Sequence, residues 1–381
     1  MQRLARVSLS SLVFGLNYAT SKAPKWDFRL NSSMRWKMRM RLRFARHFLL
    51  WTLLAFSLVQ SFPACAQALG AQKGRKRIDT WLVLDEEKGF ARIEQNADML
   101  NSLSIFGNAS KDFINRCHRL HIEVYQGVSG DATAIDTPAH RRATVDQYLQ
   151  ACQVQGYDGI DLDFEHLDPS LQGTYSEFLR QTSSALHRIG KKLSHSVGCY
   201  PNAEWNAPAK TFCDPKVVAK TCDLIRVMCY DMYWAPGWAD PKFKNHPDAL
   251  GMGPTSSYLW ARAGMRFWLG KAPRKKLVMG LPAYSNDYAL STHGGGKQVY
   301  ASKPQIQEEA EKAWLWHDRL SMYLYMEKDA VPHVFYASDA DSTKDHLETV
   351  DELNLPAIGF WHFSSVDDAT WKTVRAWLNN K

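Results

Sequence analysis

The sequence has 381 residues, of which 45% are hydrophobic and 23% are charged. These proportions are those of a folded protein and exclude wholesale disorder or a fibrous repeat. The length allows either two domains or one large barrel. The formal net charge of +8 would suit a nucleic-acid-binding protein. However, residues 1–66 hold 11 basic residues and one acidic residue, which leaves 36 basic and 38 acidic residues in 67–381, so we expect no nucleic-acid partner.

The basic N-terminal part has the segment order of a secretory signal peptide. Basic residues crowd the stretch 35–47, the next twelve residues are almost wholly apolar, and small residues at 64–66 offer a cleavage site. A membrane anchor is the alternative, but the apolar run is shorter than the roughly 20 residues that a spanning helix needs. We therefore expect a signal peptide at about residues 34–66.

These features predict two parts of the chain, an N-terminal extension with a signal peptide (residues 1–66) and one catalytic domain (residues 67–381). We expect this domain to be secreted, periplasmic or on the cell surface, with no membrane span after cleavage. Its six cysteines allow up to three disulfides, and Cys199 and Cys213 are candidates to pair. The histidines are scattered and no C-x-x-C pair occurs, so a structural zinc site is not expected.

Short apolar runs rich in β-branched residues alternate with helical stretches along the domain. Between the third and fourth runs, Val145, Tyr148 and Cys152 are spaced as one face of a helix. Strands that helices bury on both sides are typical of a parallel sheet. The eight predicted strands are Ile78–Leu84, Ser102–Phe106, Leu120–Tyr125, Gly159–Phe164, Leu193–Gly198, Leu224–Tyr230, Lys276–Leu281 and Ala357–Phe363.

Eight such units predict an α/β fold, a (β/α)8 TIM barrel, which usually takes about 250 residues and leaves room for insertions. A doubly wound open sheet is the alternative, but no Gly-rich phosphate-binding sequence follows the first strand. The longest gap between strands holds two further extended runs, Met322–Met326 and His333–Tyr336, which predict a small hairpin. We therefore expect a single catalytic domain with a short insertion between strands 7 and 8.

The fourth predicted strand carries a row of carboxylates. Asp161, Asp163 and Glu165 alternate with apolar residues, so all three point to the same side of the strand. In a barrel the apolar set would pack under the helices, and the acids would point inward at the C-terminal end, where barrel active sites lie. Three neighbouring carboxylates cannot all stay ionised without cost, so we expect a raised pKa in at least one of them. Such pKa shifts are typical of functional sites.

Two other interpretations of this acidic row are an exposed edge strand and a metal site. An exposed edge strand would leave the acids solvated, but the opposite face of this strand is strongly apolar. Closely placed carboxylates also bind calcium or magnesium. The neighbouring strands, however, offer Met228, Tyr230 and Trp361 rather than further oxygen ligands. We therefore expect no metal site and no cofactor.

The acidic row also belongs to a longer sequence pattern. Glycoside hydrolase family 18, the chitinase family, has the signature D-G-x-D-x-D-x-E, which the run D-G-I-D-L-D-F-E at 158–165 resembles. Three later segments resemble family motifs in the same order along the chain: M-C-Y-D at 228–231 resembles M-x-Y-D, G-L-P-A-Y at 280–284 resembles G-x-P-x-Y, and G-F-W at 359–361 supplies the tryptophan of the site floor.

This resemblance implies hydrolysis of β-1,4-linked N-acetylglucosamine glycans, chitin or chito-oligosaccharides, with retention of configuration. The substrate's own 2-acetamido oxygen attacks C1, in place of an enzyme nucleophile. The resemblance makes Glu165 the acid that protonates the glycosidic oxygen and later activates water. Asp163 would bond the acetamide N–H and share a proton with Asp161, and Tyr230 would hold the acetamide oxygen in position.

The resemblance also implies a set of substrate-binding residues. Trp361 would form the floor under the sugar, and Asp231 would bind the sugar beside Tyr230. Trp234 would extend the aromatic surface from the loop after the sixth strand. The complete predicted set of substrate-binding residues is Asp231, Met228, Tyr284, Trp361 and Trp234.

The chain departs from the family pattern in two places. The third strand reads E-V-Y-Q-G at 123–127, where the family commonly has S-x-G-G. Ser285-Asn286 follow Tyr284, where the family often has Gly-Arg, so a basic substrate contact is missing. The insertion after the seventh strand is also too short for the extra α+β domain of processive chitinases, which predicts a shallow, open groove.

A non-catalytic glycan-binding protein on the same fold is the alternative of a different functional class. Such relatives typically lose the acidic Glu, whereas Glu165 is present here. An N-acetylglucosaminidase directed at peptidoglycan or N-glycans stays open as well. The sequence leaves the oligomeric state and the choice between endo and exo action open.

Overall fold

The computed structural model describes residues 76–200, 211–237, 251–291, 295–302, 314–316, 319, 321–326 and 331–380. The predicted extension and its signal peptide lie outside these described residues. Within them, no helix is both long enough and apolar enough to cross a membrane.

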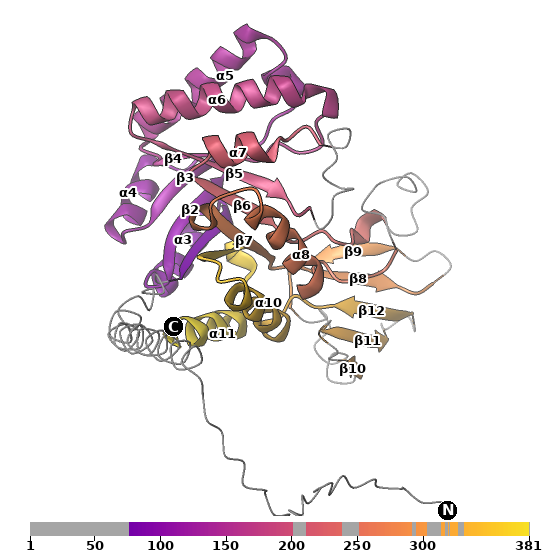
Figure 1. The fold of residues 1–381 in the computed structure, drawn as a ribbon. Coiled ribbons are helices and arrows are strands. Elements are labelled where there is room, and N and C mark those ends of the chain that lie inside the picture. Colours follow the sequence, from indigo (N-terminus) through magenta and orange to yellow (C-terminus); the bar gives the residue numbers. More distant parts are fainter. Residues whose placement is uncertain are drawn as a thin grey trace, which may run out of the picture. The chain divides into compact units, whose positions relative to one another are not determined.

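Eight parallel strands close into a barrel, which confirms the predicted (β/α)8 fold and excludes the open doubly wound sheet (Figure 1). Each strand pairs with its neighbour in chain order, and the last pairs with the first. All eight predicted strands are present, with shifted ends. They are β1 (Arg77–Val83), β2 (Leu100–Phe106), β3 (Glu123–Val128), β4 (Gly159–Leu162), β5 (Lys192–Gly198), β6 (Leu224–Met228), β7 (Leu277–Pro282) and β13 (Ala357–Trp361).

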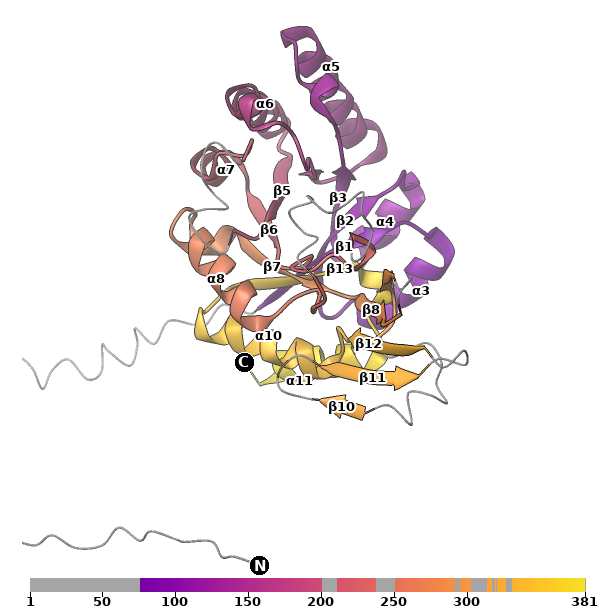
Figure 2. The same ribbon diagram turned by 90° about the vertical axis from the view of Figure 1, so that its right-hand side faces the viewer.

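Helices surround these strands, as Figure 2 shows. The predicted helical face between the third and fourth strands is confirmed, because Val145, Tyr148 and Cys152 are all buried. The described helices are α3 (Glu86–Asn96), α4 (Lys111–Arg119), α5 (Pro138–Gln150), α6 (Gln172–Arg188), α7 (Pro215–Thr221), α8 (Tyr258–Leu269), α10 (Ala340–Glu352) and α11 (Asp368–Asn379).

The apolar side of the acidic strand packs under these helices, as the alternation predicted. Ile160 and Leu162 of β4 are fully buried. Phe164, two residues further on, places its ring 5.6 Å from that of Tyr175 and 5.7 Å from that of Phe178, both on α6. Burying a side chain of this size stabilises the fold by about 1.5–3 kcal/mol. The packing therefore fixes which face of the strand turns inward.

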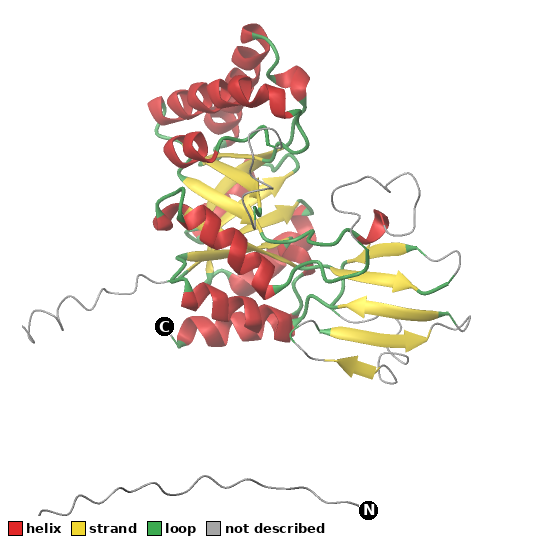
Figure 3. Ribbon diagram, turned by 45° about the vertical axis from the view of Figure 1, so that its right-hand side comes forward, coloured by secondary structure: helices red, strands yellow, loops and turns green. Residues whose placement is uncertain are grey.

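A five-stranded antiparallel sheet is inserted between β7 and α10, and Figure 3 shows it beside the barrel. The predicted hairpin is present as the pair β11 and β12, and the other three strands of the sheet were not predicted. The order across the sheet is β10, β11, β12, β8, β9. The strands are β8 (Ser285–Ala289), β9 (Gly296–Val299), β10 (Trp314–Trp316), β11 (Met322–Met326) and β12 (Pro332–Tyr336).

The missed strand β8 begins with polar residues that read as a loop. In the structure Ser285, Asn286 and Asp287 are buried and hydrogen-bonded. The Asn286 amide donates to the carbonyl oxygens of Tyr233 and Gly253, and the Tyr325 hydroxyl donates to Asp287. Buried polar groups need such partners, and here they come from distant parts of the chain.

The predicted pairing of Cys199 with Cys213 is wrong, because both thiols are free and buried. The Cys213 Sγ lies 3.9 Å from Nε2 of His195, whereas the Cys199 Sγ lies 4.0 Å from the carbonyl oxygen of Trp260 on α8. The other four described cysteines, Cys117, Cys152, Cys222 and Cys229, are also free and buried.

A close backbone approach joins β13 to β1. The Thr80 hydroxyl donates to the carbonyl oxygen of Phe360 (2.9 Å) and accepts from its N–H (2.8 Å). A Cβ atom at Gly359 would lie 2.0 Å from the carbonyl oxygen of Asp79. Only glycine therefore fits at this position.

We expect Gly359→Ala to destabilise the protein by about 3 kcal/mol or more, because the obstructing atoms belong to the backbone and cannot move aside. Gly173→Ala on α6 is the matched control, since a Cβ there meets no atom within 4 Å. Urea unfolding measures both. Equal stability of the two variants would contradict the assignment of a close approach.

Candidate active site

The acidic row rises from the barrel interior to its mouth. Asp161, in β4, is fully buried and lies opposite Gly127 of β3 and Ser194 of β5. Asp163 follows at the end of the strand, and its N–H donates to the carbonyl oxygen of Val128 (2.8 Å). The side chain of Glu165 is 48% exposed. The three predicted acids therefore form a gradient of burial in which Glu165 is the one open to solvent.

The pKa of Asp163 is raised to about 8, chiefly by burial and further by the neighbouring carboxylates of Glu165 and Asp161, against a hydrogen bond from Ser129 that lowers it. Asp163 therefore holds a proton at neutral pH, which confirms the expectation of one raised pKa in the row. The Oδ1 atoms of Asp161 and Asp163 are buried and have no hydrogen-bond partner in the described part of the chain. A proton on Asp163 removes one of the two negative charges that these buried carboxyl groups would otherwise carry.

The other oxygen of Asp161 is held by two serine hydroxyls. Ser104 on β2 donates to Oδ2 at 2.7 Å, and Ser196 on β5 donates to the same atom at 3.1 Å. The indole N–H of Trp81 on β1 donates to the Ser196 oxygen at 2.9 Å, so the serine proton is directed to Asp161. Three strands thus fix the orientation of this carboxylate.

A fully buried arginine lies below Asp161 in the barrel. The Arg226 Nε lies 3.7 Å from Oδ2 of Asp161 and donates to Ser194 (3.0 Å). Its Nη2 donates to Ser102 (3.0 Å), which in turn donates to Oδ1 of Asp79 (2.8 Å). One guanidinium thus lies between two buried carboxylates. Arg226 was not among the predicted site residues, although a single arginine at an inward position of an apolar strand is a usable signal.

Aromatic side chains form the site beside the acids. Trp81, Tyr230 and Tyr284 make one buried cluster, with Phe106, Met228 and Trp361 packed against it. Trp361, partly exposed at the end of β13, has its ring centroid 6.3 Å from that of Trp81 and 5.2 Å from that of Phe106, edge to face. The structure thus brings together the predicted Met228, Tyr230, Tyr284 and Trp361.

The hydroxyl of Tyr230 is a hydrogen-bond donor at neutral pH. Burial raises its pKa well above the ordinary 10, and the carboxylates of Asp163, Asp231 and Glu165 raise it further. These same charges show that Tyr230 lies near the acidic row. Its ring contacts Trp81 on one side (5.9 Å between centroids) and Tyr284 on the other (6.2 Å).

Asp231 connects the barrel to the inserted sheet. Its backbone has a left-handed conformation (φ 59°). Its Oδ1 accepts hydrogen bonds from the Tyr284 hydroxyl (2.6 Å) and from the Gln298 amide on β9 (3.0 Å). Gln298 was not among the predicted site residues, because it lies in a strand that was not predicted.

Two residues of the sequence motifs lie elsewhere or at the margin. Asp158 precedes β4, accepts from the Val124 N–H (2.8 Å) and lies 2.8 Å from Nε2 of His118, which gives it a structural role at the opposite end of the strand. Trp234 is partly buried in the loop after β6, next to the short 3-10 turn Ala235–Gly237, and is not part of the aromatic cluster. In the described ranges, no group of three or more His, Cys, Asp or Glu residues is arranged to hold a metal ion.

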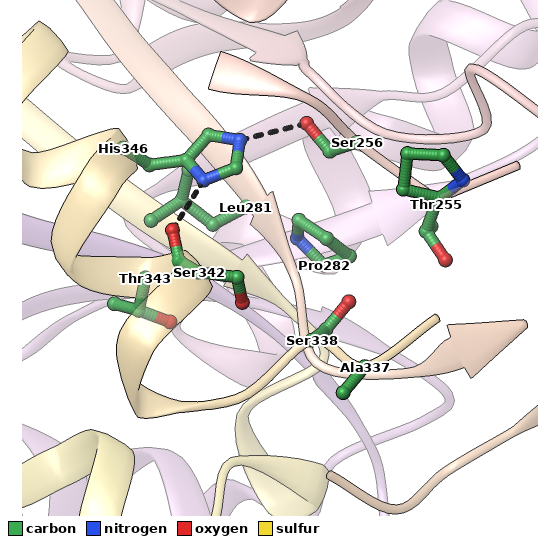
Figure 4. Close-up of a pocket in the computed structure, with 10 residues that line it drawn as sticks. Thr255, Ser256, Leu281, Pro282, Ala337, Ser338, Ser342, Thr343 and His346 are labelled. Carbon is green, nitrogen blue, oxygen red and sulfur yellow. Dashed lines mark hydrogen bonds between the residues drawn. The ribbon is translucent and has the colours of Figure 1, made fainter. Parts of the chain in front are cut away.

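A small polar cavity lies near the site without being part of it (Figure 4). Its volume of about 10 Å³ holds one water molecule at most. The Nδ1 of His346 donates to the carbonyl oxygen of Ser342 (2.7 Å), so its Nε2 accepts from the Ser256 hydroxyl (2.9 Å). Burial lowers the pKa of His346, so the ring is neutral. The hydrogen-bonded side chains at this cavity link α10 to the loop before α8.

Comparison with known proteins agrees with this geometry. The family model "Glycosyl hydrolases family 18" matches residues 90–365. The protein belongs to glycosyl hydrolase family 18.

Curated relatives are distant. The uncharacterized glycosylase YvbX of Bacillus subtilis (strain 168) is 25% identical over 246 residues, which cover 62% of this chain and 66% of the relative. The cortical fragment-lytic enzyme of the same organism is 23% identical over 238 residues, 61% of this chain and 52% of the relative. A class V chitinase of Arabidopsis thaliana is 28% identical over 178 residues, 45% of each chain. The chain thus spans between about half and two thirds of the length of these relatives.

Solved structures share the fold. The chitinase from Chromobacterium violaceum ATCC 12472 superimposes with a TM-score of 0.68 at 21% identity, over 80% of this chain and 100% of that one. The Bacillus cereus spore cortex-lytic enzyme SleL does so with a TM-score of 0.65 at 16% identity, over 79% of this chain and 75% of that one.

The raised pKa of Asp163 predicts how the stability of the folded protein depends on pH. Because the pKa rises from an ordinary 3.8 to about 8, the folded protein keeps a proton at this carboxyl that the unfolded chain has lost between these pH values. The contribution of Asp163 to the free energy of unfolding should therefore fall as the pH rises from about 4 to about 8. The total decrease amounts to several kcal/mol.

Asp163→Asn removes this titration and keeps the shape of the side chain. We expect the difference in unfolding free energy between the native protein and this variant to change steadily with pH over that range, in favour of the variant at high pH. Urea unfolding at a series of pH values measures it. Parallel curves for the two proteins would show that Asp163 has an ordinary pKa.

Proposed function

We propose that the protein is an exported glycoside hydrolase that cleaves β-1,4-linked N-acetylglucosamine glycans, such as chitin or chito-oligosaccharides, with retention of configuration. The observation that carries this proposal is the acidic row, in which a protonated Asp163 stands between a buried Asp161 and an exposed Glu165. A protonated carboxyl is a poor nucleophile, which favours attack by the substrate's acetamido oxygen. The predicted signal peptide is the ground for export.

Glu165 is suited to be the general acid and base. It is the most exposed member of the row and therefore the one that can reach a glycosidic oxygen. In the first step the acetamido oxygen bonds to C1, the bond from C1 to the glycosidic oxygen breaks, and Glu165 gives its proton to that oxygen. In the second step Glu165 takes a proton from water, whose oxygen bonds to C1 and opens the oxazolinium ring.

The pair of Asp161 and Asp163 stabilises the charge that develops on the acetamido group. The pair holds one proton, on Asp163, and thus one negative charge. Asp163 faces the acetamide N–H, while Ser104 and Ser196 keep Asp161 in place from behind. The negative charge is therefore already in position when the oxazolinium forms, with no rearrangement needed.

Tyr230 holds the acetamide oxygen near C1, because its hydroxyl stays protonated beside the acidic row. Such positioning lowers a barrier by removing the need to orient the reacting group. Trp361 offers a partly exposed ring as the floor for the sugar. Met228, Tyr284 and Asp231 border the same space, and Trp234 reaches the bound glycan from its loop.

A glycan of the bacterial cell wall is the second candidate substrate. Two similar proteins point to it by name, the cortical fragment-lytic enzyme of Bacillus subtilis and the spore cortex-lytic enzyme SleL of Bacillus cereus. Peptidoglycan contains N-acetylglucosamine, so the same acetamido chemistry applies. A glycan-binding protein without activity is disfavoured, because Glu165, Asp163 and Tyr230 are all present.

We expect Glu165→Gln to lower the rate of release from a chromogenic N-acetylchito-oligosaccharide by at least about a hundredfold, because the general acid is lost. Glu177→Gln on α6 is the matched control, since this glutamate is exposed on a helix away from the barrel mouth. Its rate should equal that of the native protein.

Two outcomes would contradict the proposal. Undiminished activity of Glu165→Gln would remove the assigned acid. A native protein that binds the oligosaccharides but cleaves neither them nor peptidoglycan would be a glycan-binding protein instead.

A further inference from the structure

The inserted sheet turns its edge strand toward the barrel mouth. A Cβ atom at Gly296 of β9 would lie 2.1 Å from the carbonyl oxygen of Ala235, so the strand packs directly on the loop after β6. This is the loop that begins with Asp231 and carries Trp234. The face of β9 that carries Gly296 is therefore covered by the same segment that supplies part of the proposed site.

The two faces of β9 have different neighbours, because side chains alternate along a strand. Val299 is buried among Tyr325, Phe335 and Ala337 inside the inserted sheet. Gln298, on the opposite face, donates to Oδ1 of Asp231. Tyr300 follows directly after the strand, and its ring lies near that of Tyr284, whose hydroxyl donates to the same Asp231 oxygen as Gln298. One face of the strand thus supports the sheet and the other meets the barrel.

Tyr300 stands at the mouth of the barrel, held by two ring contacts. Its centroid lies 5.6 Å from that of Tyr284 and 5.3 Å from that of His362, the residue after Trp361. Even so, 53% of Tyr300 is exposed. A large aromatic ring that is fixed in place and open to solvent beside a sugar site offers a stacking surface at little entropic cost.

We propose that Tyr300 binds the sugar unit adjacent to the one on Trp361, and that the inserted sheet thereby determines how long a glycan the protein prefers. This inference rests on the proposed function, since it extends that site by one sugar unit. The ligand is an oligosaccharide of N-acetylglucosamine, whose apolar ring faces suit an aromatic platform.

The test uses the full chain with Glu165→Gln, which binds without cleaving. Calorimetry gives the Kd of N-acetylglucosamine and of N-acetylchito-oligosaccharides of increasing length for this parent and for the parent with Tyr300→Ala. We expect Tyr300→Ala to weaken binding of the oligosaccharides about tenfold and to leave binding of the monosaccharide unchanged, because the single sugar on Trp361 does not reach the ring.

Two further variants in the same parent serve as controls. Tyr300→Phe keeps the ring and should bind as the parent does at every length. Met326→Ala changes a side chain of β11 that is 51% exposed, in the same sheet and away from the site, and should also leave every Kd unchanged.

The outcomes separate the inference from the proposed function. If the parent binds no oligosaccharide of any length, the proposed function fails and the inference fails with it. If the parent binds but Tyr300→Ala matches it at all lengths, only the inference is overturned. An equal loss at every length, the monosaccharide included, would also overturn it, because Tyr300 would then act on the fold of the site.

Discussion

The buried guanidinium of Arg226 is the constraint on which the site depends. Removing a carboxylate from water is costly unless charge and hydrogen bonds replace the solvent. Arg226 supplies the charge to Asp161, and the hydroxyls of Ser104 and Ser196 supply the hydrogen bonds. The negative charge of Asp161 raises the pKa of Asp163 and so helps keep the proton on Asp163. The chemistry at the mouth thus depends on a polar network deep in the barrel.

From this network outward, the site is assembled from distant parts of the chain. The acids come from β4, the aromatic floor from β1, β6, β7 and β13, and one wall from the inserted sheet. Asp231 links these parts, since Tyr284 from the barrel and Gln298 from the insertion donate to the same oxygen. The closed barrel brings these strand ends together. The sheet inserted after β7 adds residues on one side of the barrel mouth.

The sequence predicted those features that local patterns encode. Alternation along the fourth strand correctly separated the inward acids from Ile160, Leu162 and Phe164, and the crowding of the acids correctly implied a proton near neutral pH. The strands of the barrel were found because each is a short apolar run. The family motifs correctly gathered Tyr230, Tyr284 and Trp361, which lie far apart in the chain.

Other features depend on contacts between distant residues, which no local pattern shows. Arg226 is an isolated charge in an apolar strand, and its partners Ser102, Asp161 and Ser194 come from three other strands. Ser285-Asn286-Asp287 read as a loop, because the groups that satisfy them lie in other segments. For the same reason, no local pattern shows that Cys199 and Cys213 have different neighbours.

The most direct test of the proposed chemistry is the dependence of kcat/KM on the acyl group of the substrate. A series of chromogenic glycosides in which the N-acetyl group carries none, one, two or three fluorine atoms lowers the nucleophilicity of the acyl oxygen step by step. If this oxygen attacks C1 beside Asp163, kcat/KM falls steeply with each fluorine. A rate that is insensitive to fluorine would contradict substrate-assisted hydrolysis and point to another nucleophile.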